Sequence, residues 1–294
     1  MRRAGLTLLL LLCAVALVDA AEPITIGETI TLPSKIMEED RTILVSTPPG
    51  YDQSTQKYPV LYMTDGDGHL THTRGTVDFL VQNGLMPPVI IVGVTNTDRT
   101  RDLTPTKVPT REVNGRVMEF PSSGGADRFL DFFESELFPY VEENYRTLPM
   151  RIFSGHSFGG LFALNAVFTR PQMFNAVLSV SPSLNWDDDL SLRQAKSFVK
   201  NHGDWNGTLF VAMADEERGD PAPTRLDRLE STLEKAPEKG LYWQVKRMPD
   251  ENHGSVVLRA HYWGLKMVFD GWQLPANPET RRFEGTLEDL ERHY

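Results

Sequence analysis

Cysteine is almost absent from this chain of 294 residues, which contains a single one, Cys13. Cys13 lies in an apolar run near the N-terminus. The remainder of the chain therefore has no disulfide, no cysteine-ligated metal site and no thiol nucleophile. A chain without such cross-links must obtain its stability from a large hydrophobic core, and its length is sufficient to form one.

Long hydrophobic runs are also lacking, apart from one at the N-terminus. Arg2 and Arg3 precede an apolar stretch, Leu6 to Val18, and Val18-Asp19-Ala20 offers small residues for cleavage before Ala21. This pattern predicts a signal peptide over residues 1–20 and export of a single domain, residues 21–294, to the periplasm or the outside of the cell. No second apolar run of about 20 residues follows, so no membrane span is predicted.

An excess of basic residues is missing as well. The chain has 30 Lys and Arg against 40 Asp and Glu, a net charge of −10, and loss of Arg2, Arg3 and Asp19 gives −11 (−10 − 2 + 1). Nucleic-acid binding needs a basic stripe, so this class of partner is excluded. The acidic balance bears on solubility and does not identify a substrate.

Strand and helix patterns alternate along the chain, without repeats or low-complexity segments. This alternation predicts an α/β fold with a central, mostly parallel sheet of about eight strands flanked by helices. A long amphipathic helix with an aromatic core face is predicted over residues 126–145, and further helices over 161–168, 189–201, 222–235 and 256–269. The predicted strands are 24–32, 41–47, 58–64, 88–94, 150–154, 176–180, 208–213 and 242–247.

The most informative motif is Gly155-His156-Ser157-Phe158-Gly159, a G-x-S-x-G sequence. It stands between the predicted strand 150–154 and the predicted helix 161–168, which is the context of a nucleophile elbow. Small residues are needed there because a Cβ atom would collide with the crossing strand and helix. Ser157 is therefore the candidate nucleophile for acyl transfer, although a serine in such a turn can also simply cap a helix.

A serine hydroxyl needs a base, and α/β-hydrolases place the acid and then the histidine after the serine in the chain. His253 lies in a turn-rich loop directly after the last predicted strand, where this base belongs. The other six histidines fit less well, because they precede the serine or lie in helices or the terminal tail: His69, His72, His156, His202, His261 and His293.

The acid of the triad should follow the strand that ends near Met213. Several carboxylates crowd this loop, and periodicity does not choose among Asp215, Glu216, Glu217 and the more distant Asp220. The oxyanion hole needs two amide donors. Phe158 supplies the first because it follows the nucleophile, and the glycine-rich loop of residues 65–69 is expected to supply the second.

Two weaker motifs are not assigned a function. His69-x-x-His72 has no third ligand nearby, so no metal site is predicted, and no cofactor is implied. Asn206-Gly207-Thr208 is a glycosylation sequon that has meaning only in a eukaryotic secretory pathway.

These motifs together resemble a known family, the esterases of the α/β-hydrolase superfamily that include enterochelin (siderophore trilactone) esterases, feruloyl esterases, S-formylglutathione hydrolase and mycolyltransferases. The resemblance covers about residues 25 to 272. It rests on the segments 58–66 (YPVLYMTDG), 99–105 (RTRDLTP), 124–130 (GGADRFL), 155–160 (GHSFGG), 181–183 (SPS) with Trp186, and 252–255 (NHGS).

The resemblance implies a role for each matching residue. It makes Ser157 the nucleophile, His253 the base and Glu216 the acid, with the backbone amides of Phe158 and Asp67 as oxyanion donors. Arg99 and Arg101, together with Arg111, could form a cationic rim for an anionic or catecholate substrate, or pair with the many acidic side chains. Trp186 could line the acyl pocket or simply pack.

The sequence thus predicts an exported serine esterase that hydrolyses small-molecule carboxylic esters through an acyl-enzyme, with siderophore trilactones among the candidate substrates. Two alternatives remain: an acyltransferase of the mycolyltransferase type, which would use the same triad, and a non-catalytic binding protein on a hydrolase scaffold. Peptidase chemistry is also open to such a triad, but the resemblance favours esters.

Overall fold

The structure is a computed structural model that describes residues 23–113, 115–202, 205–216, 222–237, 239–277, 279–280 and 282–293. The signal peptide predicted over residues 1–20 lies outside these ranges. The strands are β1 (Glu28–Ser34), β2 (Glu39–Ser46), β3 (Tyr58–Met63), β4 (Ile90–Val94), β5 (Thr110–Val113), β6 (Arg116–Glu119), β7 (Thr147–His156), β8 (Ala176–Val180), β9 (Gly207–Ala214) and β10 (Leu241–Met248). The helices are α1 (Gly66–Gln82), α2 (Arg99–Leu103), α3 (Ala126–Phe132), α4 (Phe138–Asn144), α5 (Phe158–Thr169), α6 (Leu190–His202), α7 (Arg225–Leu233), α8 (Val256–Val268) and α9 (Leu287–His293), with short turns of helix η1 (Tyr51–Gln53), η2 (Phe133–Leu137) and η3 (Pro171–Met173).

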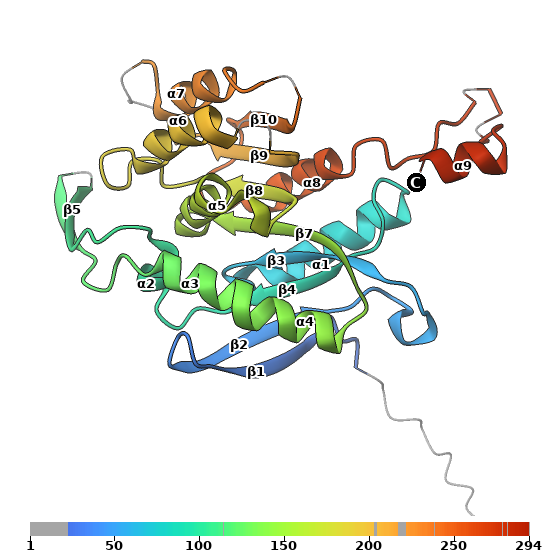
Figure 1. The fold of residues 1–294 in the computed structure, drawn as a ribbon, viewed down its shortest axis with the longest axis horizontal. Helices are drawn as coiled ribbons and strands as arrows, with labels where there is room; N and C mark the ends of the chain where they lie inside the picture. Colours follow the sequence, from blue (N-terminus) through green and yellow to red (C-terminus); the bar gives the residue numbers. More distant parts are fainter. Residues whose placement is uncertain are drawn as a thin grey trace, which may run out of the picture.

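The centre of the molecule is an eight-stranded sheet in the order β1-β2-β4-β3-β7-β8-β9-β10 (Figure 1). β2 runs antiparallel to both of its neighbours, and every pair from β4 to β10 is parallel. Each of the eight strands predicted from the sequence is present in this sheet. The continuous apolar runs of β3, β4 and β8 are fully buried, as parallel strands covered on both faces require.

Helices cover both faces of the sheet (Figure 1). The buried side chains of α3, α4, α5, α6 and α7 form one hydrophobic cluster with one face of the sheet, and those of α1 and α8 form a second cluster with the opposite face. This is the three-layer arrangement expected for an α/β-hydrolase. The predicted fold class is therefore confirmed.

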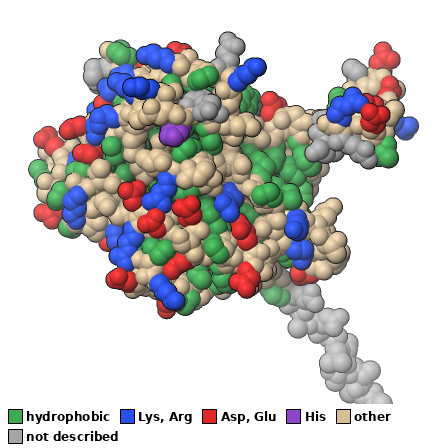
Figure 2. All heavy atoms as spheres, viewed as in Figure 1, with side chains coloured by type: hydrophobic (Ala, Val, Ile, Leu, Met, Phe, Trp, Pro, Cys, Tyr) green, Lys and Arg blue, Asp and Glu red, His purple; other side chains and the backbone are tan. Residues whose placement is uncertain are grey.

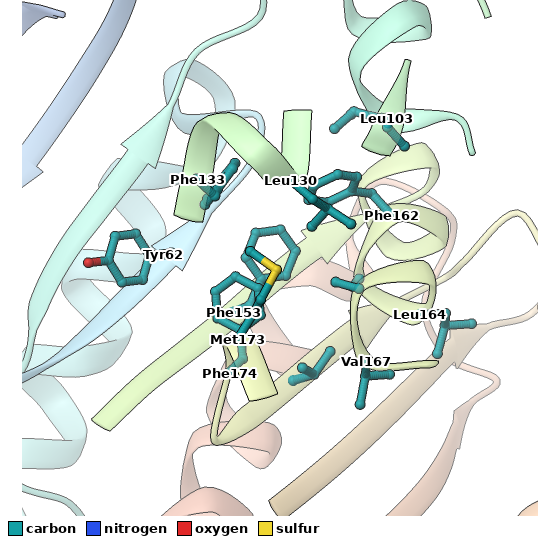
Figure 3. Packing of buried hydrophobic residues seen from close by; sticks show 14 of the residues in the cluster. Tyr62, Leu103, Leu130, Phe133, Phe153, Phe162, Leu164, Val167, Met173 and Phe174 are labelled. Carbon is teal, nitrogen blue, oxygen red and sulfur yellow. The ribbon is translucent and has the colours of Figure 1, made fainter. Parts of the chain in front are cut away.

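The first of these clusters is rich in aromatic rings (Figure 3). Phe153 on β7 lies in ring contact with Phe133, Phe162 and Phe174, at centroid distances of 5.8, 5.5 and 5.0 Å. The aromatic stripe predicted for the 126–145 helix thus belongs to the core. Its rings fix the strand that leads directly into the Gly155–Gly159 motif.

The predicted long helix over residues 126–145 is interrupted. Its middle, η2, is a π-helical turn between α3 and α4, and Pro139 lies in the first turn of α4. Proline has no amide hydrogen to donate, and its ring displaces the preceding turn, which explains the interruption.

Two elements of the structure were not predicted. The segment expected to be a glycine-rich loop, residues 65–69, is the start of α1, because only Asp65 stays outside the helix. Gly66 is needed there, since a Cβ atom would lie 2.7 Å from the carbonyl carbon of Gly93 on β4. A hairpin of β5 and β6 also projects from the body (Figure 1).

Among the described residues, no helix is both long enough and apolar enough to cross a membrane. Figure 2 shows basic and acidic side chains interspersed over the face in view, with the segment that contains α9 standing away from the body.

Candidate active site

The sequence motif Gly155–Gly159 forms a sharp turn between β7 and α5. β7 ends at His156, α5 begins at Phe158, and Ser157 between them has φ 62° and ψ −114°. A non-glycine residue with positive φ is strained by about 1–3 kcal/mol and persists only where the surrounding structure imposes it. Hydrogen bonds on both sides impose it here, from the Ser157 amide to the Val180 carbonyl (2.9 Å) and from the Leu161 amide to the Ser157 carbonyl (2.9 Å).

The glycines of the motif are required by close packing. A Cβ atom on Gly155 would collide with the Gly159 carbonyl, and one on Gly159 would collide with the Thr64 hydroxyl oxygen. A Cβ on Gly160 would lie 2.8 Å from the Val180 carbonyl oxygen. The sequence argument for an elbow therefore has a direct steric basis in this turn.

The predicted base and acid lie together on neighbouring loops. His253 Nδ1 is 2.8 Å from Glu216 Oε2, and both side chains are partly exposed. A neutral imidazole bonded in this way donates from Nδ1 and keeps Nε2 as the proton acceptor. Burial raises the pKa of Glu216, but its hydrogen bonds with His253 and Ser181 outweigh this and hold the pKa below its usual value, so the acid is ionised at neutral pH.

The main chain also joins the two loops that carry this pair. The amide of Asp215 donates to the carbonyl of Glu251 (3.1 Å), which links the loop after β9 to the loop after β10. The side chain of Asn252 accepts from the amides of Gly254 and Ser255, forming the turn that presents His253. Of the four acids considered from the sequence, the structure brings Glu216 to His253, while Glu217 and Asp220 lie outside the described residues.

His253 is brought close to the elbow through the residue before the nucleophile. His156 Nε2 is 2.7 Å from the backbone carbonyl oxygen of His253, and the two rings are 4.6 Å apart between centroids. Because His156 adjoins Ser157 in the chain, the imidazole of His253 and the hydroxyl of Ser157 belong to one region at the carboxyl ends of the parallel strands.

The predicted oxyanion donors lie at two helix N-termini. Phe158 is the first residue of α5 and Asp67 the second residue of α1, and amides in these positions have no acceptor within their own helix. The two helix starts are close, because a Cβ on Gly159 of α5 would lie 3.3 Å from the carboxylate of Asp65, just before α1. Free N–H groups and the positive helix ends both favour a negative oxygen.

Arg99, predicted to bind substrate, ties these two helix starts together. Its guanidinium donates to Asp65 Oδ1 (2.6 Å) and Oδ2 (3.1 Å) and to the carbonyl of His156 (3.1 Å). Burial raises the pKa of Asp65, but the contact with Arg99 outweighs this and keeps the carboxyl pKa below its usual value. These bonds occupy most of the guanidinium donors and fix the backbone around both predicted oxyanion amides.

Arg101 lies in an ion cluster away from the elbow. Its guanidinium pairs with Glu39 and Asp102, and the almost fully buried Arg41 pairs with the same two carboxylates, 2.7 Å from Asp102. The substrate-binding role predicted for Arg101 stays a prediction. Its observed contacts fasten α2 to the start of β2.

Trp186 and its neighbours form an aromatic wall beside the elbow. Trp186 is fully buried, donates from Nε1 to Thr106, and packs edge to face on Phe158 (5.3 Å) and Phe120 (5.5 Å). Arg111, from the β5–β6 hairpin, places Cζ 5.7 Å from the centre of the Trp186 ring. Among the described residues no carboxylate pairs with Arg111, and burial lowers its pKa, with the charge of Arg225 adding to this effect.

A second serine–histidine pair, which the sequence did not reveal, lies beneath the elbow. Ser154 on β7 and His261 on α8 form a hydrogen bond of 2.8 Å, a geometry that by itself suggests a catalytic pair. Only 1% of Ser154 and 2% of His261 is exposed, however, and His261 Nδ1 contacts Thr73 in place of a carboxylate. Nothing in the sequence signalled this pair, because β7 and α8 are far apart in the chain.

Metal ligands are not assembled at this site. Within the described ranges, no group of three or more His, Cys, Asp or Glu side chains is arranged to hold a metal ion. His69 and His72 contact each other, Nδ1 to Nε2, at 3.0 Å.

The parallel sheet, the strained serine elbow and the histidine–glutamate pair on the neighbouring loops define a serine hydrolase of the α/β-hydrolase fold. Comparison with known proteins agrees. Residues 34–258 match the sequence model of the family described as Putative esterase. The chain belongs to this family.

Individual relatives support the same placement. The chain is 31% identical to the ferri-bacillibactin esterase BesA of Bacillus subtilis over 236 residues, covering 72% of this chain and 78% of that one. It is 34% identical to a siderophore triacetylfusarinine C esterase of Aspergillus fumigatus, but the match covers 51% of this chain and only 60% of the fungal protein. The crystal structure of an IroE-like serine hydrolase from Shewanella oneidensis superposes with a TM-score of 0.73 at 33% identity, covering 83% of this chain and 80% of that one.

Proposed function

We propose that this protein hydrolyses carboxylic esters with Ser157 as nucleophile, His253 as base and Glu216 as orienting acid, and that siderophore esters are its substrates. The hydrogen bond between His253 and Glu216, anchored beside the strained Ser157 by His156, is the observation that carries the proposal. Membership of the esterase family supports the reaction class.

In the proposed reaction, His253 Nε2 accepts the proton of Ser157 as its oxygen attacks the ester carbonyl. The negative charge that develops on the carbonyl oxygen lies against the amides of Phe158 and Asp67. The tetrahedral intermediate collapses, and the alcohol leaves with the proton from His253. Water, deprotonated by the same imidazole, then attacks the acyl-enzyme and releases the acid.

The substrate class rests on the relatives and on the wall beside the elbow. Two relatives are described as acting on siderophores, the bacillibactin and triacetylfusarinine C esterases. In this chain Arg111 offers a partly buried cation over the aromatic wall of Trp186, Phe120 and Phe158. Such a wall suits an aryl ester, and a cation that has no carboxylate partner in the described part of the chain suits an anionic one, as in a ferric catecholate.

We therefore expect hydrolysis of a ferric catecholate trilactone and, more weakly, of neutral p-nitrophenyl esters. Arg111→Gln should raise KM for the anionic trilactone about 5–30-fold, the loss expected for one charge-assisted contact of about 1–2 kcal/mol, while KM for p-nitrophenyl butyrate stays unchanged. Steady-state kinetics on both substrates provide the measurement. Arg116→Gln is the matched control, because Arg116 is exposed on the same hairpin.

Three results would contradict parts of this proposal. Equal KM values for Arg111→Gln and wild type on the trilactone would refute the role of Arg111. Transfer of the acyl group to added sugar or lipid alcohols in place of water would make the protein an acyltransferase. Tight binding of the trilactone without turnover of any ester would make it a binding protein on a hydrolase scaffold.

We also propose export, supported by the apolar N-terminal run between Arg3 and Ala21. The measurement is the intact mass of the protein recovered from the periplasm or medium of an expressing bacterium. Cleavage before Ala21 is the expected result, and an uncut chain retained in the cytoplasm would contradict it.

A further inference from the structure

Five imidazole rings form a continuous row from the proposed base into the core. The ring centroids of His253 and His156 are 4.6 Å apart, those of His156 and His69 5.6 Å, those of His69 and His72 5.1 Å, and those of His72 and His261 5.7 Å. The row crosses from the loop after β10 to β7, then to α1, then to α8. The first three of these segments carry or directly precede the proposed base, nucleophile and second oxyanion donor.

The hydrogen bonds at the deep end of the row indicate which ring nitrogen of His261 carries the proton. The Thr73 hydroxyl has a single hydrogen, which it donates to the carbonyl of His69 (2.7 Å), so towards His261 Nδ1 (3.0 Å) it accepts. His261 therefore carries its proton on Nδ1, and Nε2 accepts from the Ser154 hydroxyl (2.8 Å). Complete burial, helped by the neighbouring histidines, lowers the pKa of His261 well below its usual value, which agrees with this neutral form.

The bond at the upper end is equally directional. The carbonyl oxygen of His253 can only accept, so His156 donates to it from Nε2 over 2.7 Å. Burial, followed by the charges of His253 and His69, lowers the pKa of His156 to about 4, so the ring is neutral at physiological pH. No second positive charge then stands beside His253 when its imidazolium forms.

Two separate contacts therefore hold His253. The carboxylate of Glu216 orients its ring through Nδ1, and the ring of His156 holds its main chain. We propose that His156 is a positioning residue that keeps the main chain of His253 over the nucleophile elbow, so that the imidazole reaches the Ser157 hydroxyl. This inference rests on the proposed function of Ser157 and His253.

The location of His156 makes this coupling rigid. His156 is the last residue of β7, its own carbonyl accepts from Arg99, and its ring lies between those of His69 and His253. Any shift of the His253 loop away from the elbow must break the bond to His156. Because proton transfer demands hydrogen-bond distance, a displacement of about 1 Å can cost about 100-fold in rate.

The test compares three variants with wild type on p-nitrophenyl butyrate. His156→Phe keeps an aromatic ring but removes the donor, and we expect kcat to fall about 10–100-fold with KM within about threefold. His156→Gln places an amide NH₂ where Nε2 was, and we expect it to restore kcat to within about threefold of wild type. His202→Phe is the control, since His202 is an exposed histidine at the end of α6.

Thermal melts and Ser157→Ala complete the experiment. A folded His156→Phe with wild-type kcat would overturn the proposal, and so would equal losses in folded His156→Phe and His156→Gln, because the donor would then not matter. If His156→Phe does not fold, the Gln variant decides alone: wild-type kcat supports the proposal, and a large loss in a folded protein overturns it. Turnover by Ser157→Ala at a rate close to wild type would instead refute the proposed function itself.

Discussion

Replacing Ser157 by alanine is expected to lower kcat for p-nitrophenyl butyrate by at least about 10⁴-fold, in line with losses on removing the nucleophile of a serine hydrolase. The serine at this position has the strained backbone of an elbow, and its neighbour His156 binds the loop that carries His253. Residual turnover would come from the oxyanion amides and binding alone. The measurement is steady-state kinetics, with mass spectrometry to locate the serine labelled by a fluorophosphonate.

The matched control is Ser154→Ala, which removes the other serine that is bonded to a histidine. We expect its kcat to remain within about threefold of wild type, because Ser154 and His261 are too deeply buried to meet a substrate. The change leaves His261 Nε2 without its donor, so we expect a loss of about 1–3 kcal/mol in the free energy of unfolding. This appears as a lower midpoint in thermal or urea unfolding.

The two alanine variants are expected to have opposite effects on kcat, so together they decide which serine is the nucleophile. An inactive, folded Ser154→Ala beside an active Ser157→Ala would transfer the nucleophile to the buried pair. Labelling of Ser154 by the fluorophosphonate would point the same way and would require an opening of the core that the structure does not show.

The sheet could be predicted from the sequence because its strands carry their own signal. Continuous apolar runs such as those of β3 and β8 are required wherever both faces of a strand are covered, and they are uncommon elsewhere. The elbow could be predicted as well, because its glycine pattern is partly local: a Cβ atom on Gly155 would collide with the Gly159 carbonyl four residues further along the chain. Steric requirements between residues close in the chain can be recognised from a short sequence motif.

Features that depend on long-range contacts left no such trace. The start of α1, residues 65–69, was expected as a loop because it contains Gly66 and Gly68, and the reason for Gly66 is the close approach of β4. The bonds of Arg99 to Asp65 and of His156 to His253 join segments 34 and 97 residues apart. From its residue type alone, Arg99 suggested substrate binding, and His156 suggested no role.

The residues of the loop after β9 did not by themselves decide which carboxylate is the triad acid, because that choice also depends on a long-range contact. The test of this acid has the second largest expected effect. Glu216→Gln should lower kcat by about 10²–10⁴-fold, because an amide can donate to His253 Nδ1 and favour the wrong tautomer, as loss of the acid does in other serine hydrolases. The carboxylate is the only group in the described part of the chain seen to accept from His253 Nδ1. KM should change little, since the residue orients the base without touching the substrate. Kinetics on p-nitrophenyl butyrate provide the measurement.

Asp215→Asn is the control for this prediction, because it alters the neighbouring carboxylate and leaves the amide that bonds to Glu251 in place. Its kcat should stay within about threefold of wild type. A larger loss for Asp215→Asn than for Glu216→Gln would shift the acid by one residue. Full activity of both variants would mean that Ser157 and His253 act as a dyad, with His253 held through its main chain by His156 and the turn around Asn252 rather than through its ring by a carboxylate. In that case the main-chain anchor of His253, and not its acid, would be what keeps the base in place.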